Sequence, residues 1–401
     1  MHDMVEHDVI IAGAGPAGCA LALYLAQQGA SVLLLEAQHA LPMDLRASTF
    51  HPPSLDMLAT LGVTQRLIEI GLVTPHYQYR DRRTGERAVF DMSLLAGETD
   101  YPFRLQCEQY KMTRIVCAML TDYPNAKVRF NHRALRAENC GDHAELTVSA
   151  PDGERQLKAR YIIGADGASS AVRKSLGIEF SGFTYPELFL VVSSPFPFED
   201  VLPGLSNVNY VSDPDEWCVI LRTPEIWRVL LPTQPGDSTD KLLSDEFVYA
   251  RLQHLTSRPG PFDVRHRTLY NVHQRVANTY RVDRVLLVGD AAHINNPLGG
   301  MGMNGGLHDA FNLGEKLVKV LRGDAGDELL DRYDRQRRTI ALDFVQQHTI
   351  HNKQLMEERD PQQQQRRQAE FTRTANNPAL AKAFLLKNSM IQSLREVEKI
   401  P

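Results

Sequence analysis

The chain of 401 residues has little of what several protein classes require. It has five cysteines, an odd number with no CxxC pair, so we expect neither a disulfide framework nor a zinc site or other metal site. It has no excess of basic residues: the formal net charge is −5 and its lysines and arginines are scattered, which disfavours a nucleic-acid partner. The cysteine usage fits a reducing, cytoplasmic compartment best.

No long uninterrupted apolar run is present either. Residues 9–26 carry no charge, but three glycines and Pro16 interrupt them where a spanning helix would need to continue. Acidic residues, Asp3, Glu6 and Asp8, precede this run, whereas a secretory signal needs a basic leading region. The run therefore predicts a strand, a turn and a helix, with no integral membrane segment.

The pattern of apolar residues predicts an α/β protein with more than one lobe, because single cores stop growing well below this length. Strand 8–12, helix 17–28 and strand 31–36 form a βαβ unit that starts a doubly wound, Rossmann-like lobe. Strands 160–164 and 284–289 return the chain to it. An antiparallel β-sheet is expected from a hairpin at 77–90 and from strand-like pieces at 188–192, 208–211, 217–221, 227–231 and 264–270.

The first glycine motif follows the first strand. Gly13, Gly15 and Gly18 satisfy GxGxxG, with Pro16 and Ala17 opening the helix. The spacing allows a tight turn, a close approach of pyrophosphate to the backbone and close packing of helix on strand. Glu36 ends the next strand, where a carboxylate can accept hydrogen bonds from ribose hydroxyls. The motif predicts a dinucleotide site.

A second glycine-rich segment at 289–304 indicates which dinucleotide is bound. Gly289 and Asp290 end a strand, and the side chain of Asp290 can bond the hydroxyls of a ribityl chain. The segment then begins a helix, whose backbone amides at Gly300, Gly302, Met303 and Asn304 can face the N1 and C2 carbonyl of a flavin. Because reduced flavin carries negative charge there, these amides favour FAD over nicotinamide as the resident cofactor.

These motifs, together with Gly164 to Arg173, resemble the class A flavoprotein aromatic hydroxylases, which have the p-hydroxybenzoate hydroxylase fold. The resemblance covers about residues 8–345. It implies that Asp166 contacts FAD and NAD(P)H, that Arg173 contacts the nicotinamide nucleotide, and that Arg46 and Gln106 contact flavin, Arg46 also serving the nicotinamide nucleotide. It implies that Pro297 lies beside the reacting face of the flavin, where its backbone orients the substrate. Pro297 is therefore the predicted catalytic residue.

The resemblance implies a monooxygenase in which NADH or NADPH binds transiently and reduces FAD. A flavin C4a-hydroperoxide then hydroxylates a small phenolic or heteroaromatic ring, which can be acidic. It also implies the following division: an FAD-binding domain of residues 1–75, 103–182 and 276–345, a substrate-binding β-sheet domain of 76–102 and 183–275, and a C-terminal helical region of 346–401. The polar C-terminal helical region is a candidate surface for a homodimer.

An aromatic substrate needs a flat apolar slot, and an acidic one also needs a guanidinium anchor. In the predicted sheet the candidates are Tyr210, Trp217, Arg222, Trp227 and Arg228. Strand alternation puts Trp217 and Arg222 on opposite faces, and also Trp227 and Arg228, so at most half of them can point inward. Which half does so depends on a register that the sequence does not give.

Two alternatives remain open. One is a flavin-dependent halogenase or reductase on the same fold, although residues 225–228 do not supply the halogenase Trp-x-Trp-x-Ile-Pro run. The other is a catalytically silent FAD-binding interaction protein, which would not need amides aimed at a reactive ring. His293 could act as a base, but a histidine just after a strand is more often structural.

Overall fold

A predominantly parallel sheet organises the first lobe. The structure is a computed structural model that describes residues 5–43, 47–258 and 260–401. Its first sheet has the strand order β17-β18-β11-β1-β2-β8, with β10 paired to β11 and β9 to β10. The strands are β1 (His7–Ala12), β2 (Val32–Leu35), β8 (Ala126–Arg129), β9 (Arg133–Asn139), β10 (Ala144–Ala150), β11 (Gly153–Gly164), β17 (Arg281–Val282) and β18 (Val285–Leu287).

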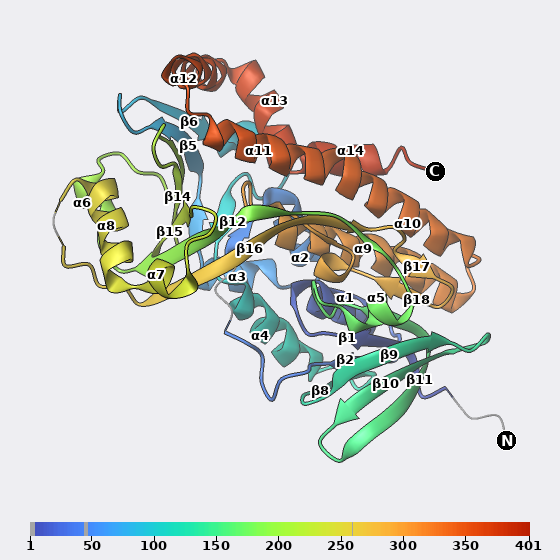
Figure 1. Ribbon diagram of the computed structural model, residues 1–401. Coiled ribbons are helices and arrows are strands. Elements are labelled where there is room, and N and C mark those ends of the chain that lie inside the picture. Colours follow the sequence, from blue (N-terminus) through green and yellow to red (C-terminus); the bar gives the residue numbers. More distant parts are fainter. Residues whose placement is uncertain (1–4, 44–46, 259) are drawn as a thin grey trace.

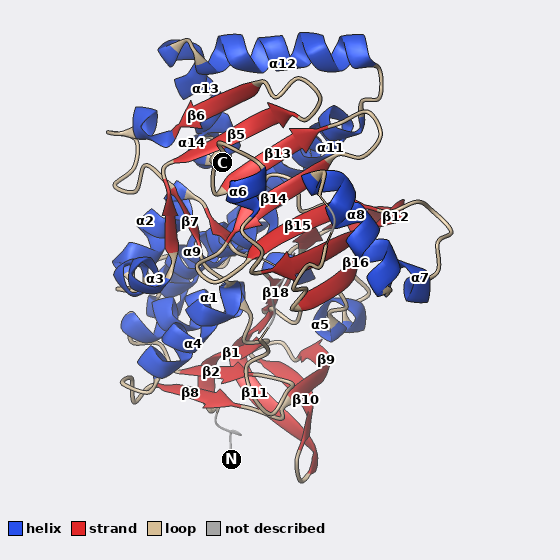
Figure 2. Cartoon of the chain, turned by 90° about the vertical axis from the view of Figure 1, so that its left-hand side faces the viewer, coloured by secondary structure: helices blue, strands red, loops and turns tan. Residues whose placement is uncertain are grey.

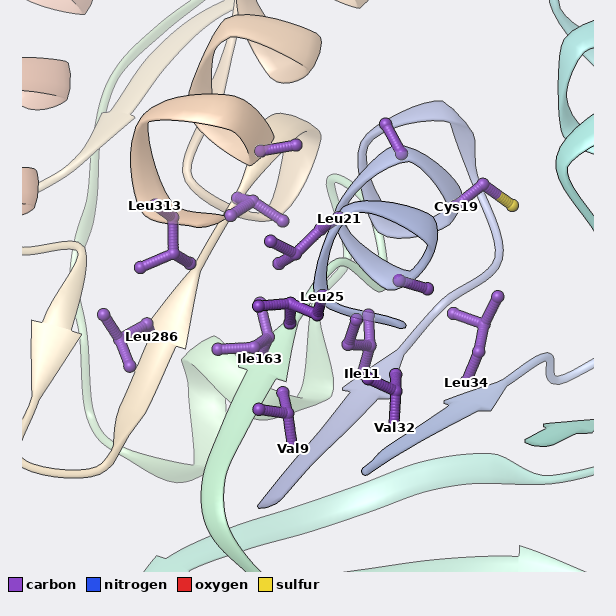
Figure 3. Packing of buried hydrophobic residues seen from close by; sticks show 14 of the residues in the cluster. Val9, Ile11, Cys19, Leu21, Leu25, Val32, Leu34, Ile163, Leu286 and Leu313 are labelled. Atoms are coloured by element: carbon purple, nitrogen blue, oxygen red, sulfur yellow. The ribbon is translucent and has the colours of Figure 1, made fainter. Parts of the chain in front are cut away.

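The centre of this sheet is parallel and fully buried. Strand β1 pairs in parallel with both β2 and β11, and β11 pairs in parallel with β18. Helices α1 (Pro16–Gln27) and α9 (Met301–Arg322) pack on one face and on each other. Aliphatic side chains of the two helices and of β1, β2, β11 and β18 interlock between them (Figure 3). A sheet buried on both faces explains why these strands are continuous apolar runs.

A second eight-stranded sheet forms the other lobe (Figure 2). Its order is β19-β16-β12-β15-β14-β13-β5-β6, and its pairs are antiparallel except for the parallel pair β5–β13. The strands are β5 (His76–Asp81), β6 (Arg87–Asp91), β12 (Phe180–Ser194), β13 (Val208–Ser212), β14 (Cys218–Arg222), β15 (Trp227–Pro232), β16 (His266–Ala277) and β19 (His293–Ile294). The antiparallel expectation therefore needs correction at one pair, because β5 enters the sheet from an earlier part of the chain.

Two long strands join the lobes. Strands β12 and β16 pair from Phe180 with Ala277 to Ser193 with His266, with an irregularity between Thr184 and Leu188. That irregularity contains Pro186, which cannot donate a ladder hydrogen bond. The predicted boundaries at 182/183 and 275/276 lie within these two strands. The predicted strand 264–270 was accordingly too short.

The remaining elements cover these sheets. Strands β3 (Thr49–Phe50), β7 (Arg104–Gln106) and β4 (Leu72–Thr74) form a small third sheet. Other helices are α2 (Pro52–Thr60), α3 (Thr64–Ile70), α4 (Gln109–Leu120), α5 (Ala171–Ser175), α6 (Phe198–Val201), α7 (Thr239–Leu243) and α8 (Asp245–Thr256).

The C-terminal part of the chain is helical, as the sequence predicted, and extends from the first lobe, where its first helix contacts α9 and β17, to the β5–β6 edge of the second sheet (Figure 1). Its helices are α10 (Glu328–Ile340), α11 (Gln347–Glu357), α12 (Pro361–Ala375), α13 (Pro378–Asn388) and α14 (Ile391–Val397), with a π-helical segment, Ala341–Gln346, between α10 and α11. Helices α12 and α13 contact β6, so this region covers a sheet edge. No helix in the described ranges has the length and apolar content needed to cross a bilayer.

Candidate active site

One cavity of about 780 Å³ runs between the two lobes. Its lining includes Gly13, Gly15, Pro16, Ala17 and Glu36 from the first motif and Asp166 from the middle one. It also includes Gly289, Asp290, Pro297, Gly300, Gly302 and Met303 from the last motif. Three segments that are far apart in sequence therefore meet around one space, as the motifs predicted.

The three glycines of the first motif have different roles. A Cβ at Gly13, which has φ +110°, would lie 2.3 Å from the carbonyl oxygen of Ala165. A Cβ at Gly18 would lie 2.1 Å from the carbonyl oxygen of Gly13. By contrast, a Cβ at Gly15 would meet nothing within 4 Å and would occupy open space beside the cavity. Gly13 and Gly18 are needed for packing, whereas Gly15 leaves room for a ligand.

Glu36 faces the same end of the cavity. Its Oε2 accepts a hydrogen bond from the backbone N–H of Ala14 at 3.2 Å, and its Oε1 accepts one from Gln38 at 2.9 Å. These bonds fix the carboxylate beside the glycine turn, at the position expected for a ribose-binding acid.

Helix α9 begins at the cavity with an uncapped end. Its N-cap is Gly300, with φ +69°, and no side chain caps its amides. Helix α1 likewise begins beside the cavity with Gly15 as an uncapped N-cap. Helix N-termini attract negative charge, and the amides of the first turn lack partners within the helix. These two ends suit a pyrophosphate and the electron-rich edge of a flavin, so the residues present fit FAD.

Asn304 supports the start of α9 and is not among the cavity-lining residues. Its Nδ2 donates to the carbonyl oxygens of Gly300 at 2.7 Å and Thr49 at 2.9 Å, and its Oδ1 accepts from the N–H of His51 at 2.9 Å. The side chain is fully buried. It therefore holds the loop of Thr49 against the helix start.

Asp290 gives a first testable prediction. It lies on the cavity wall in the 3-10 turn Gly289–Ala291. Replacing it by Ala should weaken FAD binding by about 10- to 100-fold, because a hydrogen bond to a charged group contributes about 1.5–3 kcal/mol. Asp290→Asn keeps an acceptor and should lose less. Flavin fluorescence titration of the apoprotein measures both, and parent-level affinity in Asp290→Ala would contradict the assignment.

Asp166 caps a helix as well as lining the cavity. Its Oδ2 accepts from the backbone N–H groups of Ala171 at 2.7 Å and Val172 at 3.1 Å, and its Oδ1 accepts from Ser170 Oγ at 2.5 Å. The carboxylate therefore stabilises the first turn of α5. Its contact with FAD or NAD(P)H, which the resemblance implied, stays a prediction, and its position on the cavity wall allows such a contact.

Arg173 is buried next to this turn. Its guanidinium donates to the carbonyl oxygens of Ala291 and Ala168, each at 2.8 Å, and lies 3.8 Å from the ring centroid of Phe180. It does not line the cavity, because these contacts turn it into the protein. The geometry thus gives Arg173 the role of tying the turn after β18 to the middle motif. To contact the nicotinamide nucleotide, the Arg173 side chain would have to break its bonds to Ala291 and Ala168.

Two other predicted flavin residues are placed differently. Gln106 is fully buried in β7, where its Oε1 accepts a hydrogen bond from Thr49 Oγ1 at 3.0 Å, and it does not line the cavity. It acts on the site through the strand β3 that carries Thr49. Arg46 lies outside the described residues.

His293 is structural. Its Nε2 lies 2.7 Å from Oδ2 of Asp309, an aspartate that also accepts from the N–H of Gly289 at 3.0 Å and from Arg337 Nε at 2.6 Å. Burial, the largest single effect, raises the pKa of Asp309, but the electrostatic interactions and hydrogen bonds with His293 and Arg337 together outweigh it and lower this pKa. This buried network joins the Gly289 turn to α9 and α10.

The substrate-side wall comes from one face of the second sheet. Val191, Val208, Tyr210, Val219, Leu221, Arg228, Leu230 and Val272 line it. The opposite face packs against α8 through residues such as Trp227, Val229 and Leu231. Tyr210 and Arg228, two of the predicted substrate residues, therefore face the cavity.

Trp217 and Arg222 do not line this cavity. Trp217 lies at the end of the inward face, where it packs edge-on against Phe189 with ring centroids 5.5 Å apart. Arg222 donates to Glu199 Oε1 at 3.0 Å, and Trp227 donates its Nε1 to Glu199 Oε2 at 2.7 Å. The inward-facing expectation for Arg222 is thus corrected by strand alternation and by its ion pair on the other face.

Arg104, a cavity residue in the short strand β7, was not among the residues that the sequence predicted for the site. Its guanidinium lies 4.0 Å from the ring centroid of Tyr77, and it is 2% exposed. Within the described part of the chain, its Nε has no hydrogen-bond partner. Arg228 reaches the same cavity, with Nη1 3.3 Å from Ser48 Oγ. No periodic pattern surrounds Arg104, so only its charge in an apolar context could have drawn attention to it.

A separate polar cluster lies on the β9–β10 hairpin. Cys140, His143 and Glu145 place their potential ligand atoms within 4.8 Å of one another. His143 Nδ1 already lies 2.6 Å from Asp142, and its Nε2 lies 3.2 Å from Glu145, so both ring nitrogens have carboxylate partners. These contacts raise the pKa of His143. The hydrogen-bonding groups of His143 are therefore satisfied within the hairpin without a metal ion.

Comparison with known proteins decides the family. The FAD binding domain family matches residues 6–348. The chain is 33% identical over 400 residues to para-nitrophenol 4-monooxygenase of Pseudomonas sp. (strain WBC-3), which covers 98% of this chain and 97% of that protein. The chain belongs to this FAD-binding family.

Other relatives agree with this placement. The crystal structure of p-nitrophenol 4-monooxygenase from Pseudomonas putida DLL-E4 superposes with a TM-score of 0.90 at 32% identity, covering 97% of this chain and 98% of that one. The chain is also 31% identical to 6-hydroxy-3-succinoylpyridine 3-monooxygenase of Pseudomonas putida (strain DSM 28022 / S16), over 85% of this chain and 86% of that protein.

The chain is therefore a FAD-dependent aromatic monooxygenase, as the motifs and the resemblance predicted. These relatives do not favour the halogenase, reductase or silent FAD-binding alternatives. FAD is the cofactor, and NAD(P)H is the reductant usual for this family.

Proposed function

We propose that this FAD-dependent monooxygenase hydroxylates a small phenol that carries a compact polar substituent, of which p-nitrophenol is the first candidate. The observation that carries the proposal is a pair of buried guanidinium groups, Arg104 and Arg228, in a cavity whose wall on the side of the second sheet is mostly aliphatic and aromatic. A phenolate or nitro oxygen can accept hydrogen bonds from such groups, and charge-assisted bonds are the stronger ones. The aliphatic residues beside them fit the faces of an aromatic ring.

The roles of the chain follow from this arrangement. Bound FAD supplies the oxygen-transfer chemistry with NAD(P)H and O2. Arg104 and Arg228 bind and orient the ring, while Val208, Val219 and Leu230 exclude water from its faces. Pro297 lines the same cavity just before the start of α9, where its loop would hold the ring in line with the flavin.

The relatives support this substrate class. Para-nitrophenol 4-monooxygenase and 6-hydroxy-3-succinoylpyridine 3-monooxygenase are named for hydroxylated six-membered rings with a polar substituent. We further propose that NADH or NADPH binds transiently, with Asp166 as a contact on the cavity wall. A cytoplasmic location follows from the need for this reductant. A homodimer stays a prediction, which sedimentation of the purified protein would test.

A substrate panel tests the proposal. FAD-loaded protein should oxidise NADH or NADPH faster with p-nitrophenol than with p-cresol, which has no polar substituent, and faster than with nitrobenzene, which has no hydroxyl. Formation of a hydroxylated product should accompany this oxidation. If none of these compounds stimulates oxidation, the proposed substrate class is wrong.

Arg228 gives the matching mutational prediction. Arg228→Met should raise the KM for the phenol by about 10- to 100-fold, since losing a bond to a charged group costs about 1.5–3 kcal/mol. Arg222→Met is the matched control, because Arg222 lies on the opposite face of the same sheet and pairs with Glu199. An unchanged KM in Arg228→Met, or an equal rise in Arg222→Met, would contradict the assignment.

A further inference from the structure

The loop that carries Pro297 has little regular structure of its own. Residues 295–300 separate β19 from α9, and Gly300 donates its N–H to the carbonyl of Pro297 at 3.0 Å. Pro297 is exposed on the cavity side, while its neighbours Asn296 and Leu298 are buried. The shape of this loop must therefore come from side chains that contact it.

Gln274 makes the central contact with this loop. This β16 residue is fully buried, and its Oε1 accepts from the backbone N–H of Asn296 at 2.7 Å and from Asn296 Nδ2 at 3.3 Å. Its Nε2 donates to Thr349 Oγ1 at 2.8 Å and to the carbonyl oxygen of Gln346 at 3.3 Å. One amide thus joins the loop on one side to the C-terminal helices on the other.

The C-terminal helix that accepts the hydrogen bonds of Gln274 is π-helical just before Thr349. The segment Ala341–Gln346 ends where α11 begins, and π-helical turns commonly occur at functional sites. Gln346 uses its side chain to donate to the carbonyl oxygen of Ile294 at 3.2 Å. Thr349 offers its carbonyl oxygen to Asn296 Nδ2 at 2.9 Å. The end of the π-helical turn and the first turn of α11 therefore contact the end of β19 and the start of the loop.

Further bonds hold the rest of the loop. The carbonyl oxygen of Leu298 accepts from Asn352 Nδ2 at 3.4 Å, and that of Gly299 lies 2.9 Å from His51 Nε2. Inside the loop, Asn296 Oδ1 accepts from the N–H of Leu298 at 3.1 Å. Asn296 is the link between these internal bonds and Gln274, because it makes both sets.

We propose that Gln274 is a positioning residue, which fixes the Pro297 loop in the cavity wall by joining Asn296 to Thr349 and to the π-helical turn. It touches neither the cavity nor the predicted FAD contacts, so it acts through the loop. Without this link the loop would keep only the bonds from Asn296 Nδ2 to Thr349 and from Asn352 to Leu298 as attachments to the C-terminal helices. The ring of the substrate would then be held less accurately. Reducing equivalents would then be released as hydrogen peroxide instead of product.

The test compares two buried glutamines in FAD-loaded protein. Gln274→Met removes the link with little change in volume. Gln78→Met is the matched control, because Gln78 is also fully buried and donates to Asn209 Oδ1 at 2.7 Å and to the Gly204 carbonyl at 3.1 Å, away from the cavity lining. Amide hydrogen exchange of residues 293–303 should accelerate only in Gln274→Met.

Turnover provides the second measurement. In Gln274→Met the hydrogen peroxide released per NAD(P)H should rise roughly threefold and kcat for hydroxylation should fall roughly tenfold, with less than about twofold change in KM. Thr349→Val removes the hydroxyl that Gln274 bonds and should show the same direction, whereas Thr349→Ser should restore parent behaviour. The threonine pair also keeps the test decisive if Gln274→Met does not fold.

The outcomes separate this role from the proposed function. The turnover assay rests on the proposed phenol substrate, whereas the exchange assay needs no substrate. If no phenol stimulates the parent enzyme, the proposed function fails while exchange still tests Gln274. Parent-level exchange in both Gln274→Met and Thr349→Val would overturn the positioning role. Equal peroxide release from Gln78→Met and Gln274→Met would also overturn it.

Discussion

Gly15→Ala should fold like the parent apoprotein and yet bind FAD about 10- to 100-fold more weakly, because overpacking a close contact costs about 1–3 kcal/mol. The backbone at Gly15 has φ −73°, which alanine adopts easily, and its Cβ would enter open space beside the cavity. That space is where the pyrophosphate is expected to approach α1. The added methyl group should therefore disturb the ligand and not the fold.

Gly13→Ala is the contrasting substitution. Its Cβ would clash with the carbonyl of Ala165 at 2.3 Å, at a backbone φ of +110°. We expect loss of at least about 3 kcal/mol of stability in the apoprotein, since strain and overpacking add at this position. Thermal melts of apoprotein and FAD titrations distinguish the two variants. Parent-level FAD affinity in Gly15→Ala would show that the pyrophosphate does not lie against this glycine.

Acid should unfold the protein through its buried histidines. Burial lowers the pKa of His308 to about 3 and that of His348 to about 4, and it lowers the pKa of His51 well below its usual value.

Neighbouring charges add to the effect of burial on two of these histidines. Arg337 lowers the pKa of His308 further, while Asp309 opposes this effect. Nearby Lys387 and Arg104 lower that of His348, while its bond to Asn388 opposes them.

The direction of the pH effect follows from proton uptake. Below about pH 6.5 the unfolded chain protonates these histidines, whereas the folded protein keeps them neutral until the pH approaches the lowered values. The free energy of unfolding should therefore be highest above pH 6.5 and fall as the pH decreases toward 4. Between pH 8 and 5, His308 and His348 should each contribute a loss of about 2 kcal/mol.

Urea unfolding at several pH values measures this loss. The slope of the unfolding free energy against pH measures how many protons the chain takes up when it unfolds. His348→Gln removes one titrating ring, so between pH 6.5 and 5 this uptake should fall by about one proton. His266→Gln is the control, because His266 is an exposed residue of the second sheet, and it should keep the parent slope. A slope in His348→Gln equal to that of the parent would show that His348 is not charged on unfolding.

The sequence predicted the nucleotide lobe well because its signals are local. The turn at Gly13, the acid at Glu36 and the helix start at Gly300 each depend on residues next to them in the chain, and strand β1 and helix α1 lie within one residue of their predicted bounds. Strand β11 (Gly153–Gly164) was predicted only in part, chiefly over 160–164, since its first half is polar and mostly exposed. The meeting of the three motifs around one cavity could be predicted because all three were assigned to the same FAD.

The substrate side was predicted less well because it depends on long-range register. Alternation showed that Trp227 and Arg228 face opposite ways, but only the pairing of β14 with β15 shows that Arg228 faces the cavity. Arg104 enters from a three-residue strand with no pattern to mark it. Gln274 matters through partners more than 20 and 70 residues away, which no local signal could connect.

The long pairing of β12 with β16, which continues on both sides of its irregularity, also bears on how this enzyme could be re-engineered. Because each strand begins in one lobe and ends in the other, a hinge rotation of the lobes would have to break backbone ladder bonds. We therefore expect entry and departure of small molecules to depend on movements of surface loops. A chimera that takes its second sheet from a homologue should be joined outside residues 180–277, so that β12 and β16 come from the same parent.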